Sequence, residues 1–249
     1  MACARAALSA RLSGVACYDR LMRLLSYSLT AALLCGALLS AAGDKTAGRL
    51  DDSAALFSEV MSAPDKSIPQ DLLNKAACVV LVPGLKKGAF VVGAQWGRGF
   101  ALCRGPEGQG WGPPAAIRIE GGSFGAQIGV SSTDLILLVM NERGMQRLTT
   151  DKFTIGADAT AAAGPVGRSA SAQTDAMMTA EILSWSRSRG VFVGISLDGA
   201  TMRGDIDENE AMYGKRWTSK QILGSGATPP PASTKLIGLL TKYSMRKAK

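Results

Sequence analysis

The stretch that decides the fold covers residues 83–130 and reads PGLKKGAFVVGAQWGRGFALCRGPEGQGWGPPAAIRIEGGSFGAQIGV. Glycines recur along it, but apolar runs at 89–92 and 100–103 lie between them, together with Trp96 and Trp111. A flexible linker lacks such apolar residues, whereas glycine inside a strand pattern marks bulges, tight bends or close backbone approach. The stretch therefore predicts short, sharply bent strands.

The segments on either side add helices and further strands. Apolar spacing and capping signals predict helices, in chain order, at 51–61, 69–77, 142–148, 206–213 and 236–243. Asn141 and Asp205 are expected to cap two of them, and Gly214 to end one. Strands are expected at 78–82, ending at Pro83-Gly84, and at 134–140, a continuously apolar run buried on both faces. Residues 177–186 fit either a helix or a strand; we favour a strand, joined to 191–197 in a hairpin.

These elements define the fold class. We expect an α+β protein with a glycine-rich, mainly antiparallel β core, a curled sandwich or barrel-like sheet, and peripheral short helices. The domain boundaries expected are 1–42 for a signal peptide, 43–223 for the main domain, 224–233 for a Pro/Gly linker, and 234–249 for a short helix and basic tail.

The N-terminal region has the pattern of a secretory signal peptide. No charged residue occurs from 24 to 43, and the small residues Ser40-Ala41-Ala42 suit a cleavage site after Ala42. A retained membrane anchor is the alternative, and Met22 is an alternative start that would give a compact leader. We expect export to the periplasm or the extracellular space, with membrane association as a further expectation.

Composition excludes several kinds of chemistry. The chain has no histidine, which removes Ser-His-Asp and Cys-His catalysis and His-ligated zinc. We expect no enzyme activity, no metal and no cofactor. The net charge is +8, and no acidic residue follows Glu210, so the tail suits an anionic membrane surface as well as simple solubility.

Two cysteines, Cys78 and Cys103, remain after the expected cleavage, and each lies in an apolar run. In an oxidising compartment they could form a disulfide, or they could stay as two buried thiols. Spacing alone does not decide between these two states, because pairing depends on the distance between the two Cα atoms.

Three blocks in order resemble the SYLF-domain family. They are KGAFVVG with GRG at 87–99, WGPPA with GGSFGAQIG and Thr133-Asp134, and SWSRSRGVFVGISLDG at 184–199 followed by Asn209 and Tyr213-Gly214. Eukaryotic members of that family bind phosphoinositides, and yeast members bind actin filaments. The resemblance implies a non-enzymatic lipid-binding module, and the signal peptide suggests a secreted, bacterial-type member.

The expected partner is an anionic phospholipid membrane surface rather than nucleic acid, and no protein partner is named by the sequence. The alternative function is an envelope structural or protein-interaction module, an actin-binding-like scaffold without lipid affinity. In eukaryotic relatives a basic N-terminal helix helps to engage the membrane. The matching helix here is acidic, with Asp51, Asp52 and Glu59 beside Arg49.

Basic residues at turns are the candidate phosphate ligands, because Arg, Lys and exposed backbone N–H groups bind phosphate. The alternative is that they are solvated loop residues. The candidates are Lys86, Lys87, Arg168, Arg187 and Arg189. For the tryptophans, core packing is expected over a place at a membrane interface; these are Trp96, Trp111 and Trp185. The acidic group 205–210 fits a helix start better than a calcium site.

Overall fold

The computed structural model describes residues 44–244, except 64–66, 91, 106–107, 109, 125–128, 166–178, 189–190, 193–196, 198 and 225. The chain divides into two units, Met1–Asp44 and Lys45–Lys249, and the fold below is that of the second. The predicted signal peptide and two candidate ligands, Arg168 and Arg189, lie outside the described residues. Within the part described, no helix is long and apolar enough to span a membrane.

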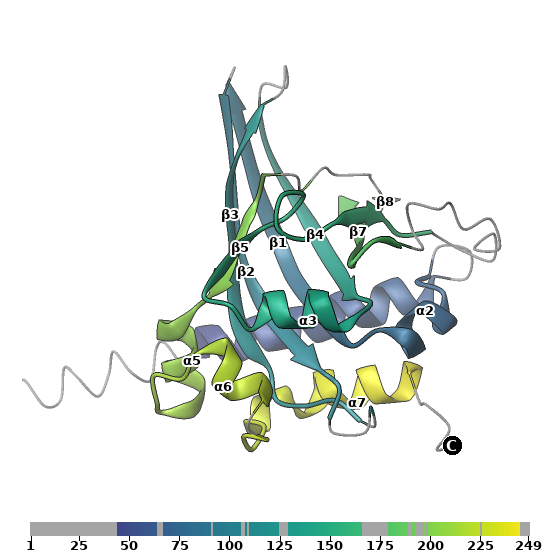
Figure 1. Cartoon of the computed structure of the whole chain (residues 1–249), viewed down its shortest axis with the longest axis vertical. Helices are drawn as coiled ribbons and strands as arrows, with labels where there is room; N and C mark the ends of the chain where they lie inside the picture. The colour runs from purple at the N-terminus through teal and green to yellow at the C-terminus, as the bar shows by residue number, and fades with distance from the viewer. Residues whose placement is uncertain are drawn as a thin grey trace, which may run out of the picture. The chain divides into compact units, whose positions relative to one another are not determined.

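A nine-stranded sheet forms the centre of the unit (Figure 1). Its order is β5-β9-β3-β2-β1-β4-β7-β6, with β8 on β7. The pairings are antiparallel except for that of β6 with β7. The strands are β1 (Cys78–Phe90), β2 (Val92–Cys103), β3 (Ala115–Phe124), β4 (Gly129–Val139), β5 (Lys152–Thr154), β6 (Ala161–Ala163), β7 (Ile182–Ser188), β8 (Val191–Phe192) and β9 (Thr201–Gly204).

The sheet curls, as the glycine-rich stretch predicts. Its two outermost strands, β5 and β6, follow each other directly in the chain, and a bridge between Ile155 and Ala159 closes the turn that joins them. Since a short turn links the opposite ends of the strand order, the sheet must bend round to bring those ends together. The predicted α+β class with a curled, mainly antiparallel core is confirmed.

The helices lie around this sheet. One covers residues 44–62; the others are α2 (Gln70–Lys75), α3 (Glu142–Leu148), α5 (Ile206–Tyr213), α6 (Ser219–Gly224) and α7 (Thr234–Tyr243), with a 3₁₀ turn at Pro231–Ser233. The predicted caps are confirmed. Asn141 accepts a hydrogen bond from Gly144 N at 2.9 Å, and Gly214 ends α5 with a φ of 67°.

Each face of the sheet carries its own hydrophobic core, which is why residues 134–140 are apolar without interruption. On one face the helix 44–62, α2 and α7 pack on Val79, Leu81 and Ile136. On the other face α3 and β5 pack around Val80, Leu137 and neighbouring side chains. Helix α7 belongs to the first core, since Leu236 and Leu240 are fully buried there.

The expected end of a strand at Pro83-Gly84 is wrong. Strand β1 continues to Phe90, and its register shifts between Leu81 and Lys86 on the β2 side. Such a bulge tolerates a proline without an N–H. Gly84 there has a φ of 64° and donates its N–H to Asp134 Oδ1 at 2.9 Å. The bulge thus bends the strand where a break is predicted.

The structure decides the state of the cysteines. Cys78 and Cys103 lie directly opposite each other on β1 and β2 and form a disulfide, with their Cα atoms 3.9 Å apart. The tryptophan prediction holds for Trp111 and Trp185, which are buried. It is wrong for Trp96, whose exposed fraction is 50%.

Candidate functional site

A cavity of about 370 Å³ lies on the sheet face that the helix 44–62 covers. Four basic side chains and one carboxylate line it, beside the exposed Trp96 and the backbone of the β1 bulge. The lining residues are Arg49, Pro83, Gly84, Lys86, Trp96, Gly97, Arg98, Arg118, Ile119 and Glu120. We call it the basic pocket.

Strand register explains why these residues meet. Lys86, Trp96 and Glu120 are successive partners across β1, β2 and β3, so they form one row. Arg98 and Arg118 are partners in the next row on the same face, because side chains two residues apart point to the same side. Arg49 reaches the pocket from the helix 44–62. The pocket therefore combines residues from four segments.

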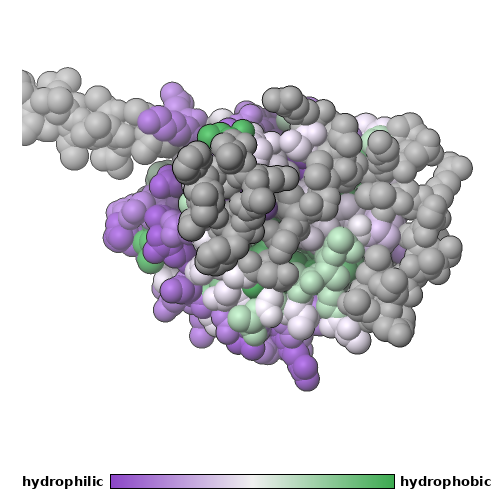
Figure 2. Space-filling model, turned by 90° about the horizontal axis from the view of Figure 1, so that it is seen from above, coloured by the Kyte–Doolittle hydropathy of each residue, from purple (hydrophilic) through white to green (hydrophobic). Residues whose placement is uncertain are grey.

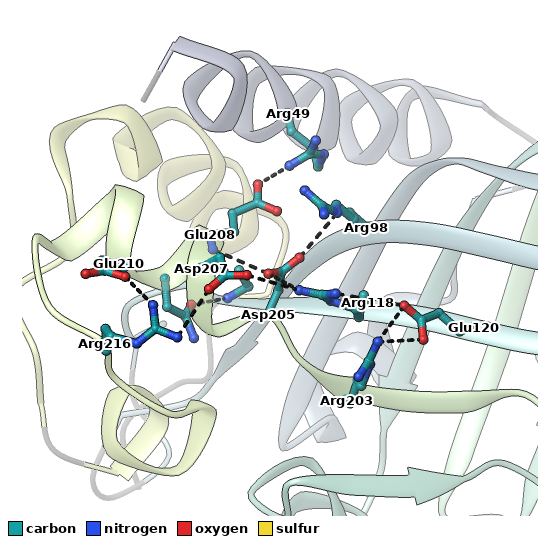
Figure 3. A network of polar contacts seen from close by, with 12 residues as sticks. Arg49, Arg98, Arg118, Glu120, Arg203, Asp205, Asp207, Glu208, Glu210 and Arg216 are labelled. Atoms are coloured by element: carbon teal, nitrogen blue, oxygen red, sulfur yellow. Dashed lines mark hydrogen bonds and ion pairs between the residues drawn. The ribbon is translucent and has the colours of Figure 1, made fainter. Parts of the chain in front are cut away.

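The first buried carboxylate of the site belongs to Asp205. Its side chain has no exposed surface, and it caps α5 by accepting from Glu208 N. Arg118 Nη2 donates to Asp205 Oδ1 at 2.6 Å, and Arg98 Nε lies 3.3 Å from Asp205 Oδ2 (Figure 3). The hydrogen bond to Asp205 raises the pKa of Arg118. Both guanidinium groups are thus held from beneath by one buried carboxylate.

A second buried carboxylate, Glu208, pairs with Arg49, which lies on the helix 44–62 (Figure 3). Desolvation raises the pKa of Glu208, although the charges of Arg49 and Arg98 act in the opposite direction. Glu208 lies three residues after Asp205, where the acidic side chain of a capping box would accept from the Asp205 backbone N–H. Instead the side chain bonds to a distant arginine, which ties α5 to the first described helix.

Further ion pairs surround these two carboxylates. Arg203 donates to both oxygens of Glu120, at 2.9 and 2.8 Å, and Arg216 contacts Asp207 and Glu210 (Figure 3). These side chains are largely exposed, so each pair contributes little to stability. These pairs hold the Arg203 and Arg216 side chains in place and neutralise part of the charge around Asp205 and Glu208.

The predicted ligands have different environments. Lys86 lines the pocket and donates from Nζ to Ser132 Oγ at 3.0 Å. Lys87 is on the opposite face of β1, where desolvation lowers its pKa. Arg187 contacts Glu59 and Asp134 at 2.5 and 3.3 Å. That any of these residues binds phosphate stays a prediction.

The structure also brings the strand of Lys86 close to the strand of Arg187, although these two candidate ligands are far apart in the sequence. Ser132 on β4 accepts from Lys86 through its hydroxyl and from the Ser188 hydroxyl through its carbonyl. Strand β1 and the β7–β8 hairpin are therefore neighbours across β4. Sequence reasoning missed Arg49, Arg98 and Arg118. The local signal for Arg98 is its place between two glycines at 97–99, and that for Arg118 is its place between two isoleucines at 117–119.

A second, larger cavity of about 480 Å³ has a less suitable lining. Its lining is mostly apolar and glycine, with Arg104 as its one cation among the described residues. The Arg104 guanidinium donates to the carbonyls of Ala76, Leu73 and Ser244 and lies over the Trp111 ring. The Arg104 guanidinium is therefore occupied by carbonyl groups at the C-terminal ends of α2 and α7. The basic pocket remains the stronger candidate site.

Comparisons with known proteins place the chain in a family. Residues 120–243 match the family described as Ysc84, Las17-binding protein actin regulator. The chain belongs to this SYLF (Ysc84) family. The SYLF match includes Glu120, the α5 cap and α7, whereas all four basic residues of the pocket precede residue 120: Arg49, Lys86, Arg98 and Arg118.

Named relatives support the SYLF assignment over a longer stretch. The chain is 32% identical over 179 residues to human SH3 domain-containing YSC84-like protein 1, covering 71% of this chain and 52% of the relative. It is 30% identical over 191 residues to the bovine protein of that name, covering 76% and 55%. It is 31% identical over 179 residues to LAS seventeen-binding protein 3 of Saccharomyces cerevisiae, covering 71% and 39%. The match thus spans about half or less of these relatives' own length.

Proposed function

We propose that this SYLF protein binds anionic phospholipid head groups at a membrane surface, without catalysis, through the basic pocket. The observation that carries the proposal is the pocket wall itself, formed by Arg49, Lys86, Arg98 and Arg118. Phosphate oxygens accept charge-assisted hydrogen bonds from guanidinium and ammonium groups. The proposal moves the contacts from the predicted loops to the sheet face, and it keeps Lys86.

The distribution of exposure supports an anionic ligand. The Arg98 side chain is 52% exposed, whereas Asp205 beneath it is fully buried. A ligand entering the pocket therefore meets Arg98 before Asp205, and Glu120 is the one exposed carboxylate among the described lining residues. Arg118 Nε is buried and has no hydrogen-bond partner among the described residues, so one donor there is still unsatisfied. Trp96, in the adjacent row with Lys86, suits the interface between water and lipid.

We also propose an exported, periplasmic or extracellular location, with the protein associated with the membrane. The disulfide between Cys78 and Cys103 supports this proposal, because disulfides persist in oxidising compartments and are rare in the cytosol. The predicted signal peptide is a second, independent argument.

The competing function is an interaction module that binds a protein and no lipid. The family description, Las17-binding protein actin regulator, favours it, as does the name of the yeast relative LAS seventeen-binding protein 3. The two functions differ in their ligand, so one set of variants can separate them.

The test is pelleting with vesicles of phosphatidylglycerol and phosphatidylcholine against phosphatidylcholine alone, at low and high salt. We expect binding that needs the anionic lipid and weakens with salt. Lys86→Glu should weaken it about tenfold, since each basic residue near an anionic surface contributes about 1 kcal/mol. Lys220→Glu, an equal charge change at an exposed position of α6, should change it less than about twofold.

Equal binding to neutral vesicles, or equal losses in the two variants, would overturn the proposal. Co-sedimentation with actin filaments is the parallel arm. The interaction module would be favoured if the protein bound actin filaments but not vesicles, and if both variants kept the filament binding.

A further inference from the structure

The four central strands extend beyond the rest of the sheet (Figure 1). Strand β9 pairs with β3 only from Ile117 to Glu120, and β7 pairs with β4 only from Asp134 to Val139. Past those rows β3, β2, β1 and β4 continue as a four-stranded ribbon, and no further strand pairs with either edge among the described residues. We call this part, residues 86–96, 120–124 and 129–132 where described, the ribbon end.

The register sorts the ribbon end into two different faces. On the face shared with the basic pocket, one row joins Val130, Gly88, Ala94 and Gly122. The next row towards the pocket joins Ser132, Lys86, Trp96 and Glu120. On the opposite face one row joins Ser131, Lys87, Gln95 and Gly121. Where side chains are described, the Val130 row is therefore apolar, and the facing row on the other side is polar.

The apolar face is unpartnered where its side chains are described. Val130 is 82% exposed and Trp96 50%, and these are two of the three large exposed hydrophobic residues found among the described positions. On the other face Gln95 is buried. No charged residue occurs from 88 to 97 or from 121 to 133. Figure 2 looks at the molecule from the side to which the ribbon points, and hydrophobic and hydrophilic patches lie next to each other there.

The order of residues along this face matches the order of layers in a membrane. The Val130 row is apolar, the next row has Trp96 and Lys86 beside Glu120, and the basic pocket follows directly. Tryptophan and lysine prefer the interface, and apolar residues the acyl layer. At about 3.3 Å per residue, the Val130 row lies roughly 7 Å beyond the row of Trp96 and Lys86, which is a small part of a hydrocarbon core of about 30 Å.

We propose that the apolar face of the ribbon end inserts into the acyl layer of the anionic membrane whose head groups occupy the basic pocket. This inference rests on the proposed function and adds the mode of attachment. The edges of β3 and β4, which have no strand partner here among the described residues, limit the depth, because unpaired backbone groups are costly in hydrocarbon. Insertion is therefore shallow and confined to one leaflet.

The test compares Val130→Glu with Ser131→Glu. Both positions are exposed on β4 and adjacent in sequence, but they belong to opposite faces. Val130→Glu should weaken binding to phosphatidylglycerol vesicles at least tenfold. Ser131→Glu, with the same change in charge, should weaken it no more than about threefold. Both variants should bind soluble glycerol 3-phosphate as the wild type does, because the pocket is intact.

A second measurement does not depend on a charged substitution. Lipids brominated on the acyl chain should quench the fluorescence of the wild type, and Trp96→Phe should remove most of that quenching. Equal losses in the two glutamate variants together with no Trp96-dependent quenching would overturn insertion while the head-group function stands. Loss of glycerol 3-phosphate and vesicle binding in Lys86→Glu, with none in Val130→Glu, would likewise overturn insertion alone. Normal vesicle binding by Val130→Glu with loss of filament binding would assign this face to a protein instead.

Discussion

Arg187 on β7 donates a hydrogen bond of 2.5 Å to Glu59 on the helix 44–62, across 128 residues of sequence. The same guanidinium lies 3.3 Å from Asp134 on β4. Burial acts to lower the pKa of Arg187, but Glu59 and Asp134 outweigh it and raise the pKa. Arg187, a predicted lipid ligand, therefore links the first described helix to the sheet.

We expect Arg187→Ala to reduce stability more than vesicle binding. A double-mutant cycle of Arg187→Ala with Glu59→Ala, measured by urea unfolding, should give a coupling of about 0.5–1 kcal/mol, since Glu59 is exposed enough for solvent to screen the pair. If vesicle affinity falls while the free energy of unfolding stays constant, Arg187 is a head-group ligand as the sequence predicts.

Asp205 should be the most sensitive polar residue of the site. Asp205→Ala removes the α5 cap and leaves Arg118 without its closest carboxylate. We expect a loss of about 3–5 kcal/mol in the free energy of unfolding, typical of breaking a buried pair. Asp205→Asn retains the cap and should lose about 1 kcal/mol less. Equal losses would show that the cap contributes nothing.

The disulfide should stabilise the fold by restricting the unfolded chain. Cys78 and Cys103 are 25 residues apart, and a loop of that size corresponds to about 3 kcal/mol. We expect the double variant Cys78→Ala/Cys103→Ala to unfold at a correspondingly lower denaturant concentration. Wild type treated with a reductant should behave like this variant, and a difference below about 1 kcal/mol would contradict the prediction.

Gly99 tests the bulge in β1. A Cβ atom at this position would lie 1.9 Å from the carbonyl oxygen of Leu81 and 2.8 Å from Val82 Cα. Backbone atoms cannot yield cheaply, so Gly99→Ala should cost about 3 kcal/mol or more. Gly122→Ala is the matched control, because its nearest neighbour would be 3.9 Å away. Thermal unfolding that ranks the two variants equally would refute the close approach.

Glu208 should give stability a defined pH dependence. Its pKa is raised above the usual 4.5 by burial, with Asp205 acting in the same direction and Arg49 and Arg98 against it. The folded chain therefore holds this proton more tightly than the unfolded chain. The contribution of Glu208 is fully present below pH 4.5 and is lost as pH rises through the raised pKa.

The measurement is the difference in unfolding free energy between wild type and Glu208→Gln across this range. That difference should decrease as pH rises, because glutamine does not titrate. A difference that is constant with pH, or one that increases, would show that Arg49 dominates and that the pKa of Glu208 is not raised.

Local chemistry determined much of this fold from the sequence alone. Asn141 and Asp205 cap their helices because their side chains reach backbone N–H groups three residues ahead. Gly214 ends α5 because it adopts a positive φ without strain. The apolar run after Asp134 predicts a strand buried on both faces, and the hairpin from β7 to β8 follows from its turn. Each of these features depends on residues within a few positions.

The tertiary structure alone decided the register and the site. The bulge at Leu81 carries β1 past Pro83, and the register then sets Cys78 opposite Cys103 and Lys86 opposite Trp96. Arg49, Arg118 and Asp205 meet only after the sheet curls and α5 docks beneath it. Such contacts join residues that are far apart in the chain, and pairing energies between distant strands leave no local periodic signal. The sequence therefore predicted the glycine-rich curl, and the fold determined which cations that curl brings together.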